Sequence, residues 1–202
     1  MFETDDQVQE YERTRSSIDL QAALVFAQHR HTTIGLPATR LSHFSTVGEL
    51  TDLYLTDLYF ETKDFIAARY MKTVCKAAAY LHEVIQFGKS FEDVVKITDD
   101  FVAGLVAQIT PDPRLPFPKR IRLFGNQIGL ASAEAQVIKL ADMRHTVKML
   151  SESPADKQEC SDFLDECKQV IPCLHKLTDP LLVKRINSLK KALKIFSKTV
   201  EG

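Results

Sequence analysis

The stretch that decides the fold is Ala79-Tyr80-Leu81-His82-Glu83-Val84, near the middle of the chain. It places a histidine and a carboxylate side by side within an apolar sequence that is typical of a helix. Such a pair is unusual there, because unpaired buried charge is costly. A second apolar stretch, Val137-Ile138-Lys139-Leu140-Ala141-Asp142, likewise ends in a carboxylate. The two stretches together predict two halves of one metal site between helices.

Helical patterns extend from these stretches over most of the chain. Ile18, Ala22, Val25 and Phe26 recur at helical intervals after Ser17, which is a suitable N-cap. The sequence Ser90-Phe91-Glu92-Asp93 predicts a capping box. The predicted helices span residues 17–28, 46–59, 63–85, 90–109, 121–130, 133–150, 157–174 and 180–199. No alternating strand pattern competes with them, so we predict an all-α fold.

Composition limits the classes of protein. The 202 residues, 45% of them hydrophobic, are enough for one globular domain, which we place at residues 15–200, after an acidic segment at 1–14 that we expect to fray. A net charge of -1 gives no general reason to expect a nucleic-acid or membrane partner. With no membrane span and no signal-peptide pattern, we expect a cytoplasmic protein. A homo-oligomer remains open.

The candidate metal ligands are His43, His82, Glu83 and Asp142. Divalent metals that activate water bind histidine nitrogen and carboxylate oxygen, with coordination positions left open. His82 and Glu83 come from one helix and Asp142 from another, and His43 lies where a loop enters a helix. Taken singly, each residue has a simpler interpretation, because a lone histidine on an apolar face is usually a core residue. Asp142 could likewise pair with Lys139 or Arg144.

Several segments, in the same order, resemble the HD-domain hydrolases of the RelA/SpoT type, especially the small alarmone hydrolases. The resemblance covers roughly residues 18–150. Ala77 to Glu83 resembles the family's A-A-L-L-H-D segment, and Ala131 to Asp142 resembles A-S-x-x-A-x-x-I-K-L-A-D. Ala23 to Ala27 followed by His31 resembles the opening helix, and Gly35 to His43 resembles G-x-P-Y-x-x-H-P.

The resemblance implies a single helical HD-domain-like fold with a divalent metal. Mn²⁺ is the first choice, and Fe²⁺, Co²⁺ and Zn²⁺ are alternatives. It also implies hydrolysis of a nucleotide phosphate or pyrophosphate ester, such as the 3′-pyrophosphate of a guanosine alarmone. His82 and Glu83 would then be catalytic as well as metal-binding. The candidate substrate contacts are Arg30, His31, Arg144, His145 and Thr146.

The chain also departs from the family pattern. Glu83 replaces the family's aspartate, which moves the carboxylate by about 1.5 Å. Gln86 and Phe87 replace the Glu-Asp pair that positions the attacking water, and Thr146 replaces an asparagine that contacts the nucleotide. We therefore expect a retained metal site, a rewritten pocket and a best substrate that is not an alarmone. A catalytically degenerate HD-fold protein that binds a nucleotide or a protein partner is the alternative, as is an interaction module that uses the basic C-terminal region 179–202.

Overall fold

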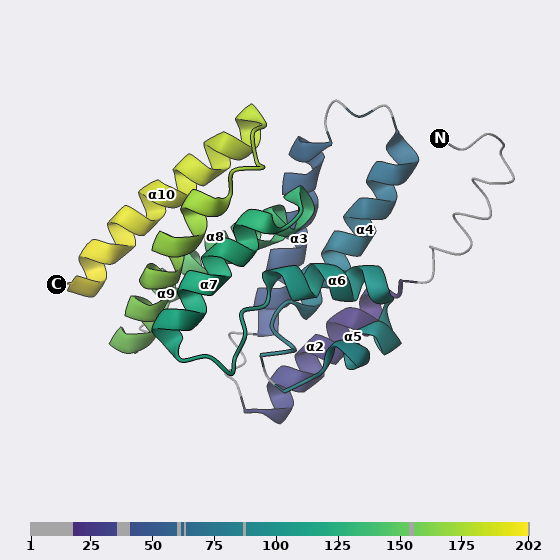
Figure 1. Ribbon diagram of the computed structural model, residues 1–202, viewed down its shortest axis with the longest axis horizontal. Helices are drawn as coiled ribbons and strands as arrows, with labels where there is room; N and C mark the ends of the chain where they lie inside the picture. The colour runs from purple at the N-terminus through teal and green to yellow at the C-terminus, as the bar shows by residue number, and fades with distance from the viewer. Residues whose placement is uncertain are drawn as a thin grey trace, which may run out of the picture.

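The structure is a computed structural model that describes residues 18–35, 41–59, 62, 64–86, 88–153 and 156–201. Over these residues it is helical and contains no strand, which confirms the predicted all-α fold (Figure 1). Ser17 and the acidic segment 1–14 lie outside the described residues. The elements are α2 (Leu20–Thr33), α3 (Leu41–Leu58), α4 (Phe65–Leu81), α5 (Phe91–Ile97), α6 (Asp100–Ile109), α7 (Phe117–Leu130), α8 (Ala133–Glu152), α9 (Lys157–Val170), the short 3-10 helix η2 (Ile171–Cys173) and α10 (Pro180–Glu201).

Helices α3, α4 and α8 pack against one another and form the centre of the molecule. In Figure 1, α2, α4, α5 and α6 lie to the right of α3, and α7, α9 and α10 lie to the left. A close approach of α3 and α4 depends on Gly48, because a Cβ there would lie 2.3 Å from the Tyr80 ring. Gly48 follows His43 on α3 and Tyr80 precedes His82 on α4, so this contact also brings the two histidines together.

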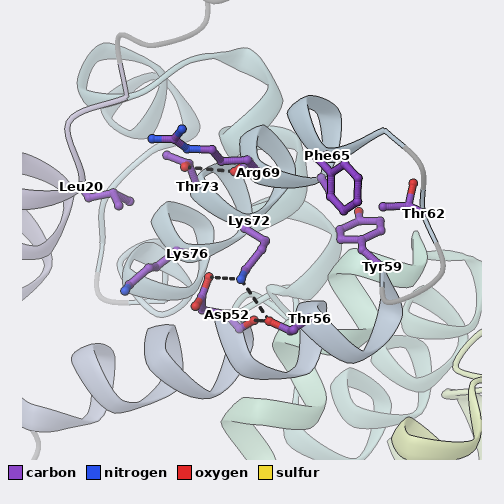
Figure 2. A pocket seen from close by; sticks show the side chains of 11 residues that line it. Leu20, Asp52, Thr56, Tyr59, Thr62, Phe65, Arg69, Lys72, Thr73 and Lys76 are labelled. Atoms are coloured by element: carbon purple, nitrogen blue, oxygen red, sulfur yellow. Dashed lines mark hydrogen bonds and ion pairs between the residues drawn. The ribbon is translucent and has the colours of Figure 1, made fainter.

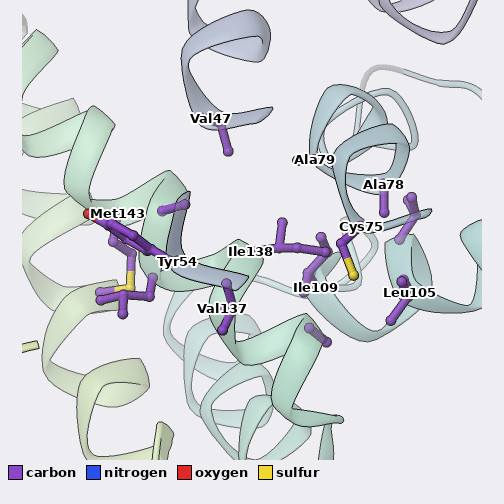
Figure 3. Close-up of a cluster of buried hydrophobic side chains, with 14 of the residues drawn as sticks. Val47, Tyr54, Cys75, Ala78, Ala79, Leu105, Ile109, Val137, Ile138 and Met143 are labelled. Carbon is purple, nitrogen blue, oxygen red and sulfur yellow. The ribbon is translucent and has the colours of Figure 1, made fainter. Parts of the chain in front are cut away.

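One hydrophobic core runs from Ile18 to Phe196 through the described helices. Figure 3 shows Val47 of α3, Cys75 of α4, Ile109 of α6 and Ile138 of α8 within it. The long C-terminal helix α10 contributes its apolar face to the same core. Among the described residues, no helix combines the length and apolar character that a membrane span requires.

Two helix boundaries differ from prediction because a side chain that was not identified as a cap begins the helix. The predicted helix over 17–28 begins at Leu20, because Asp19 is the N-cap and accepts a hydrogen bond from the Ala22 amide, and it continues to Thr33. The predicted helix over 90–109 is two helices, because Asp99 caps α6 by accepting from the Val102 amide. The capping box at Ser90 is confirmed, with reciprocal bonds between Ser90 and Asp93.

Two boundary differences move candidate site residues. The helix predicted over 46–59 begins at Leu41, so His43 lies in the first turn of α3 and not in a preceding loop. The helix predicted over 63–85 ends at Leu81, with His82 as its C-cap and Glu83 in the following turn. A smaller difference occurs near the C-terminus, where the α-helix predicted to reach Leu174 ends at Val170 and continues as η2.

Candidate metal centre

Three ligand-type atoms meet where α3, α4 and α8 pack together. Nε2 of His43 lies 3.2 Å from Nε2 of His82 and 3.3 Å from Oδ1 of Asp142, and the His82–Asp142 distance is 3.5 Å. All three residues are buried. The point equidistant from the three atoms in their plane lies about 1.9 Å from each, and metal bonds to these atoms are about 2.0–2.2 Å long. An ion slightly above that plane therefore fits the donor set.

The end of α4 fixes how His82 is oriented. The last four carbonyls of a helix lack partners within it, and the Ala79 carbonyl is one of these. Nδ1–H of His82 donates to this carbonyl over 2.7 Å, which leaves a lone pair on Nε2 in the neutral imidazole. Burial alone would lower the pKa of His82, but the negative charges of Asp142 and Glu83 outweigh burial and raise it.

His43 is oriented by a second imidazole. Its Nδ1 lies 2.8 Å from Nδ1 of His145, so one of these two nitrogens carries the proton that joins them. Burial, reinforced by the neighbouring charge of His43, lowers the pKa of His145 to about 4. A neutral His145 can accept the Nδ1 proton of His43, and Nε2 of His43 then presents its lone pair to His82 and Asp142. Such a bond to the far nitrogen is the usual support for a ligating histidine.

Asp142 uses its two carboxylate oxygens for different contacts. Oδ1 faces the two imidazoles and accepts from Oγ1 of Thr146 at 3.2 Å, whereas Oδ2 accepts from Nζ of Lys139 at 2.7 Å. These residues lie one turn apart on α8, so their side chains share a face. Burial would raise the pKa of Asp142, but Lys139 and the two histidines hold it well below its usual range. Asp142 is therefore ionised.

Glu83 does not join this cluster of three atoms. Its Oε2 lies 3.3 Å from Nε2 of His31, a fully buried residue whose ring packs edge-on against Phe44 at a centroid distance of 4.2 Å. Burial would raise the pKa of Glu83, but the contact with His31 and the charges of His82 and His43 lower it to about 2. The residue predicted as a fourth ligand is thus an anion at neutral pH that lies beside the three-atom cluster, paired with a residue predicted to contact substrate.

The other predicted substrate contacts have different surroundings. Arg30 is half-buried, and its Nη2 lies 3.1 Å from the position that a Cβ of Gly88 would occupy. Gly88 has a φ of +85°, a conformation that favours glycine, so the turn after α4 leaves room for this guanidinium. Burial raises the pKa of Tyr54, and the positive charges of Arg185 and Arg144 lower it. The electrostatic effect of Arg144 is thus felt at Tyr54. Thr146 contacts Asp142, as described above.

When His43 and His82 are neutral, a cation at the centre would bind their lone pairs. In neutral His82 the proton is on Nδ1, so Nε2 carries a lone pair. The same holds for His43 when its Nδ1 donates a proton to His145. Asp142 is an anion. Three acceptors 3.2–3.5 Å apart repel one another unless a cation lies among them. A proton added between two of these atoms forms one hydrogen bond and leaves the third atom without a partner. A divalent metal ion would bind all three.

A groove between α3 and α4 is a separate feature. It has a volume of about 610 Å³ and lies near the C-terminal half of α3 and the N-terminal half of α4, away from His43 and His82 in both helices (Figure 2). Among the described residues that line it, two of the three cations have an acidic partner. Lys72 pairs with Asp52 at 3.3 Å, and Lys76 pairs with Glu49 at 2.7 Å. Each of these two pairs is neutral as a unit, and Arg69 is the third cation that lines the groove.

The helical topology is that of the all-α HD-domain fold. The solved structure of a metazoan ortholog of SpoT that hydrolyses ppGpp has the same fold, with a TM-score of 0.63 and 22% identity over 85% of this chain and 93% of that chain. The predicted HD-like fold is thereby confirmed.

A curated relative supports the resemblance at the level of sequence. The chain is 42% identical over 66 residues to the guanosine-3′,5′-bis(diphosphate) 3′-pyrophosphohydrolase MESH1 of Drosophila melanogaster. The match covers 32% of this chain and spans 37% of the fly protein's length. No protein-family model matches the chain. The predicted resemblance to the SpoT-type HD-domain hydrolases is confirmed by the sequence match and the fold together.

Sequence reasoning missed two features of the centre. The first is the role of His145 as the partner of His43, since its position after Asp142 indicated only proximity to a phosphate. The second is Glu166 of α9, whose Oε1 lies 2.6 Å from Nζ of Lys139. The spacing of His145 three residues after Asp142 could have indicated a shared helix face. No sequence signal pointed to Glu166.

Proposed function

We propose that this chain is a metal-dependent phosphohydrolase that acts on a nucleotide phosphate or pyrophosphate ester. The observation that carries the proposal is the buried set of three acceptor atoms from His43, His82 and Asp142. The likeness to proteins that hydrolyse ppGpp supports the substrate class. A bound divalent metal would supply a water of lowered pKa and would polarise a phosphate oxygen.

The chain's own residues have distinct proposed roles at this centre. His43, His82 and Asp142 would hold the metal, and Mn²⁺ is our first choice because the resemblance to the HD-domain hydrolases implies it. Fe²⁺, Co²⁺ and Zn²⁺ fit the same donors. Glu83 is the candidate fourth ligand. With a pKa of about 2 it stays ionised at neutral pH, which suits a residue that holds a cation better than one that accepts a proton.

A second function, binding without turnover, also has a specific observation in its favour. Gln86 stands where the resembled family has an acidic residue that positions water, and a low-pKa Glu83 is a weak substitute for it. A missing general base typically costs about 10²–10⁴-fold in rate. In this alternative the HD-like fold binds a nucleotide or a protein partner and hydrolyses it slowly or not at all.

One substrate panel separates the two functions. Metal-stripped protein is given Mn²⁺ and then tested with nucleotides, guanosine alarmones and simple phosphate esters. The Asp142→Asn variant tests the centre, and Asp165→Asn on the exposed side of α9 is the matched control. We expect wild-type turnover at about 1–10³ per second on at least one nucleotide, and its loss only in Asp142→Asn. Because the residues around the centre depart from the family pattern, we expect the best substrate to differ from an alarmone. Metal binding without turnover would favour the binding function, and absence of metal binding would refute both roles of the centre.

A further inference from the structure

We propose that Glu166 is a positioning residue that controls metal affinity through Lys139 and Asp142. The inference rests on the proposed metal-dependent function and adds a residue from a helix that the sequence resemblance does not reach. That resemblance ends near residue 150, whereas Glu166 lies on α9 (Lys157–Val170). The C-terminal part of the chain would then contribute directly to the metal centre.

The contacts around Lys139 are short and buried. Its Nζ lies 2.7 Å from Oδ2 of Asp142 and 2.6 Å from Oε1 of Glu166, and the residue is 8% exposed. The same Nζ lies 5.1 Å from the centroid of the Phe124 ring. An ammonium has three N–H donors, and two of them are directed to carboxylates from different helices. Lys139 is thus held from both sides, and its position fixes Oδ2 of Asp142.

This arrangement determines which oxygen of Asp142 faces the metal centre. Because Oδ2 is bound to Lys139, Oδ1 is left to face His43 and His82. Without Glu166, Lys139 would be attracted by Asp142 alone, and its positive charge would compete with a cation for that carboxylate. With Glu166 present, the two carboxylates and one ammonium carry a net negative charge. Asp142 can therefore bind Lys139 through Oδ2 and a metal ion through Oδ1 at the same time.

A purely structural ion pair between α8 and α9 would have the same distances but a different consequence. It would contribute to the stability of the fold and leave metal affinity unchanged. The two roles are separated by measuring the metal directly, with the full chain and Mn²⁺ alone as the probe. Asp165→Asn is the matched control, because Asp165 neighbours Glu166 on α9 and its side chain is 47% exposed.

The experiment compares Mn²⁺ affinity by calorimetry in the wild type, Glu166→Gln and Asp165→Asn. We expect Glu166→Gln to weaken Mn²⁺ binding by about 10–100-fold, as for other residues that support a metal ligand, and Asp165→Asn to stay within about twofold of the wild type. The visible absorption of bound Co²⁺ should change in Glu166→Gln and not in the control, because the ligand field at Asp142 changes.

A third variant keeps the inference testable if Glu166→Gln does not fold. Glu166→Asp keeps the charge but shortens the side chain by about 1.5 Å, so we expect it to fold and to bind Mn²⁺ more weakly than Asp165→Asn does. Unchanged Mn²⁺ affinity in the folded Glu166 variants, even with a lower melting temperature, would overturn the inference and leave the proposed function intact. Absence of Mn²⁺ binding by the wild type would overturn the proposed function and the inference with it.

Discussion

Replacing Lys139 by methionine tests the electrostatic balance of the centre. Methionine keeps much of the volume and length of the lysine stem but removes the ammonium. Two carboxylates, Asp142 at 2.7 Å and Glu166 at 2.6 Å, then lose their common cation. In the wild type, burial works against the charged form of Lys139, yet Asp142 and Glu166 outweigh burial and raise its pKa. The substitution therefore leaves buried negative charge without compensation.

The expected loss of stability is large. Removing one partner of a buried ion pair costs about 3–5 kcal/mol of unfolding free energy. The entropy of unfolding is about 2.1 cal/mol/K per residue, or roughly 0.42 kcal/mol/K for 202 residues. The melting temperature should therefore fall by about 7–12 °C near neutral pH. The loss should shrink as the pH falls, because protons taken up at low pH remove the negative charge that Lys139 balances in the wild type.

Calorimetry of metal-free protein measures this effect. Lys148→Met is the control, since Lys148 lies on the same helix with 65% of its side chain exposed and only a 3.9 Å contact with Glu152. We expect the control to change the unfolding free energy by no more than about 0.5 kcal/mol. A Lys139→Met protein that melts within about 2 °C of the wild type would refute the reasoning that Lys139 neutralises the buried carboxylate of Asp142 and the partly buried one of Glu166.

Three further predictions concern the histidines and Glu83. His82→Ala should weaken Mn²⁺ binding by about 100-fold while far-UV circular dichroism still shows a helical protein, because the core does not depend on metal; unchanged metal content would make His82 a core histidine. The wild type should lose unfolding free energy as the pH falls from about 4.3 to about 2, because the pKa of Glu83 is lowered in the folded state. Urea titrations of Glu83→Gln should show a weaker dependence of the unfolding free energy on pH. An equal dependence in the variant and the wild type would contradict this prediction. NMR should show His145 titrating near pH 4 and not near 6.5, and a midpoint above 6 would remove its role as the neutral partner of His43.

The sequence predicted those features that depend on local signals. Helical periodicity and the Ser90 capping box located most helices, and the pairing of apolar helices with His82 and Asp142 placed both residues at one centre. The break between α5 and α6 was missed because Thr98 and Asp99 include neither glycine nor proline, and the capping role of Asp99 is evident only when its side chain is seen to accept from Val102. Periodicity alone does not mark such a break.

The partners of the site residues could not be predicted, because they are set by tertiary packing. His31 and Glu83 are 52 positions apart in the chain, and each was assigned a different role before their contact was seen. The contact between Lys139 and Glu166 depends on where the packing of α9 against α7 and α10 places Glu166. A pattern of residue types can therefore indicate a metal centre, whereas the supporting hydrogen bonds require the fold.

The central claim is that His43, His82 and Asp142 bind a divalent metal ion. A titration of metal-stripped protein with Mn²⁺, followed by the electron paramagnetic resonance signal of the free ion, tests it most directly. The account predicts that the wild type removes one ion per chain from solution and that Asp142→Asn removes none at the same concentrations. A free-ion signal that rises equally with and without wild-type protein would contradict it.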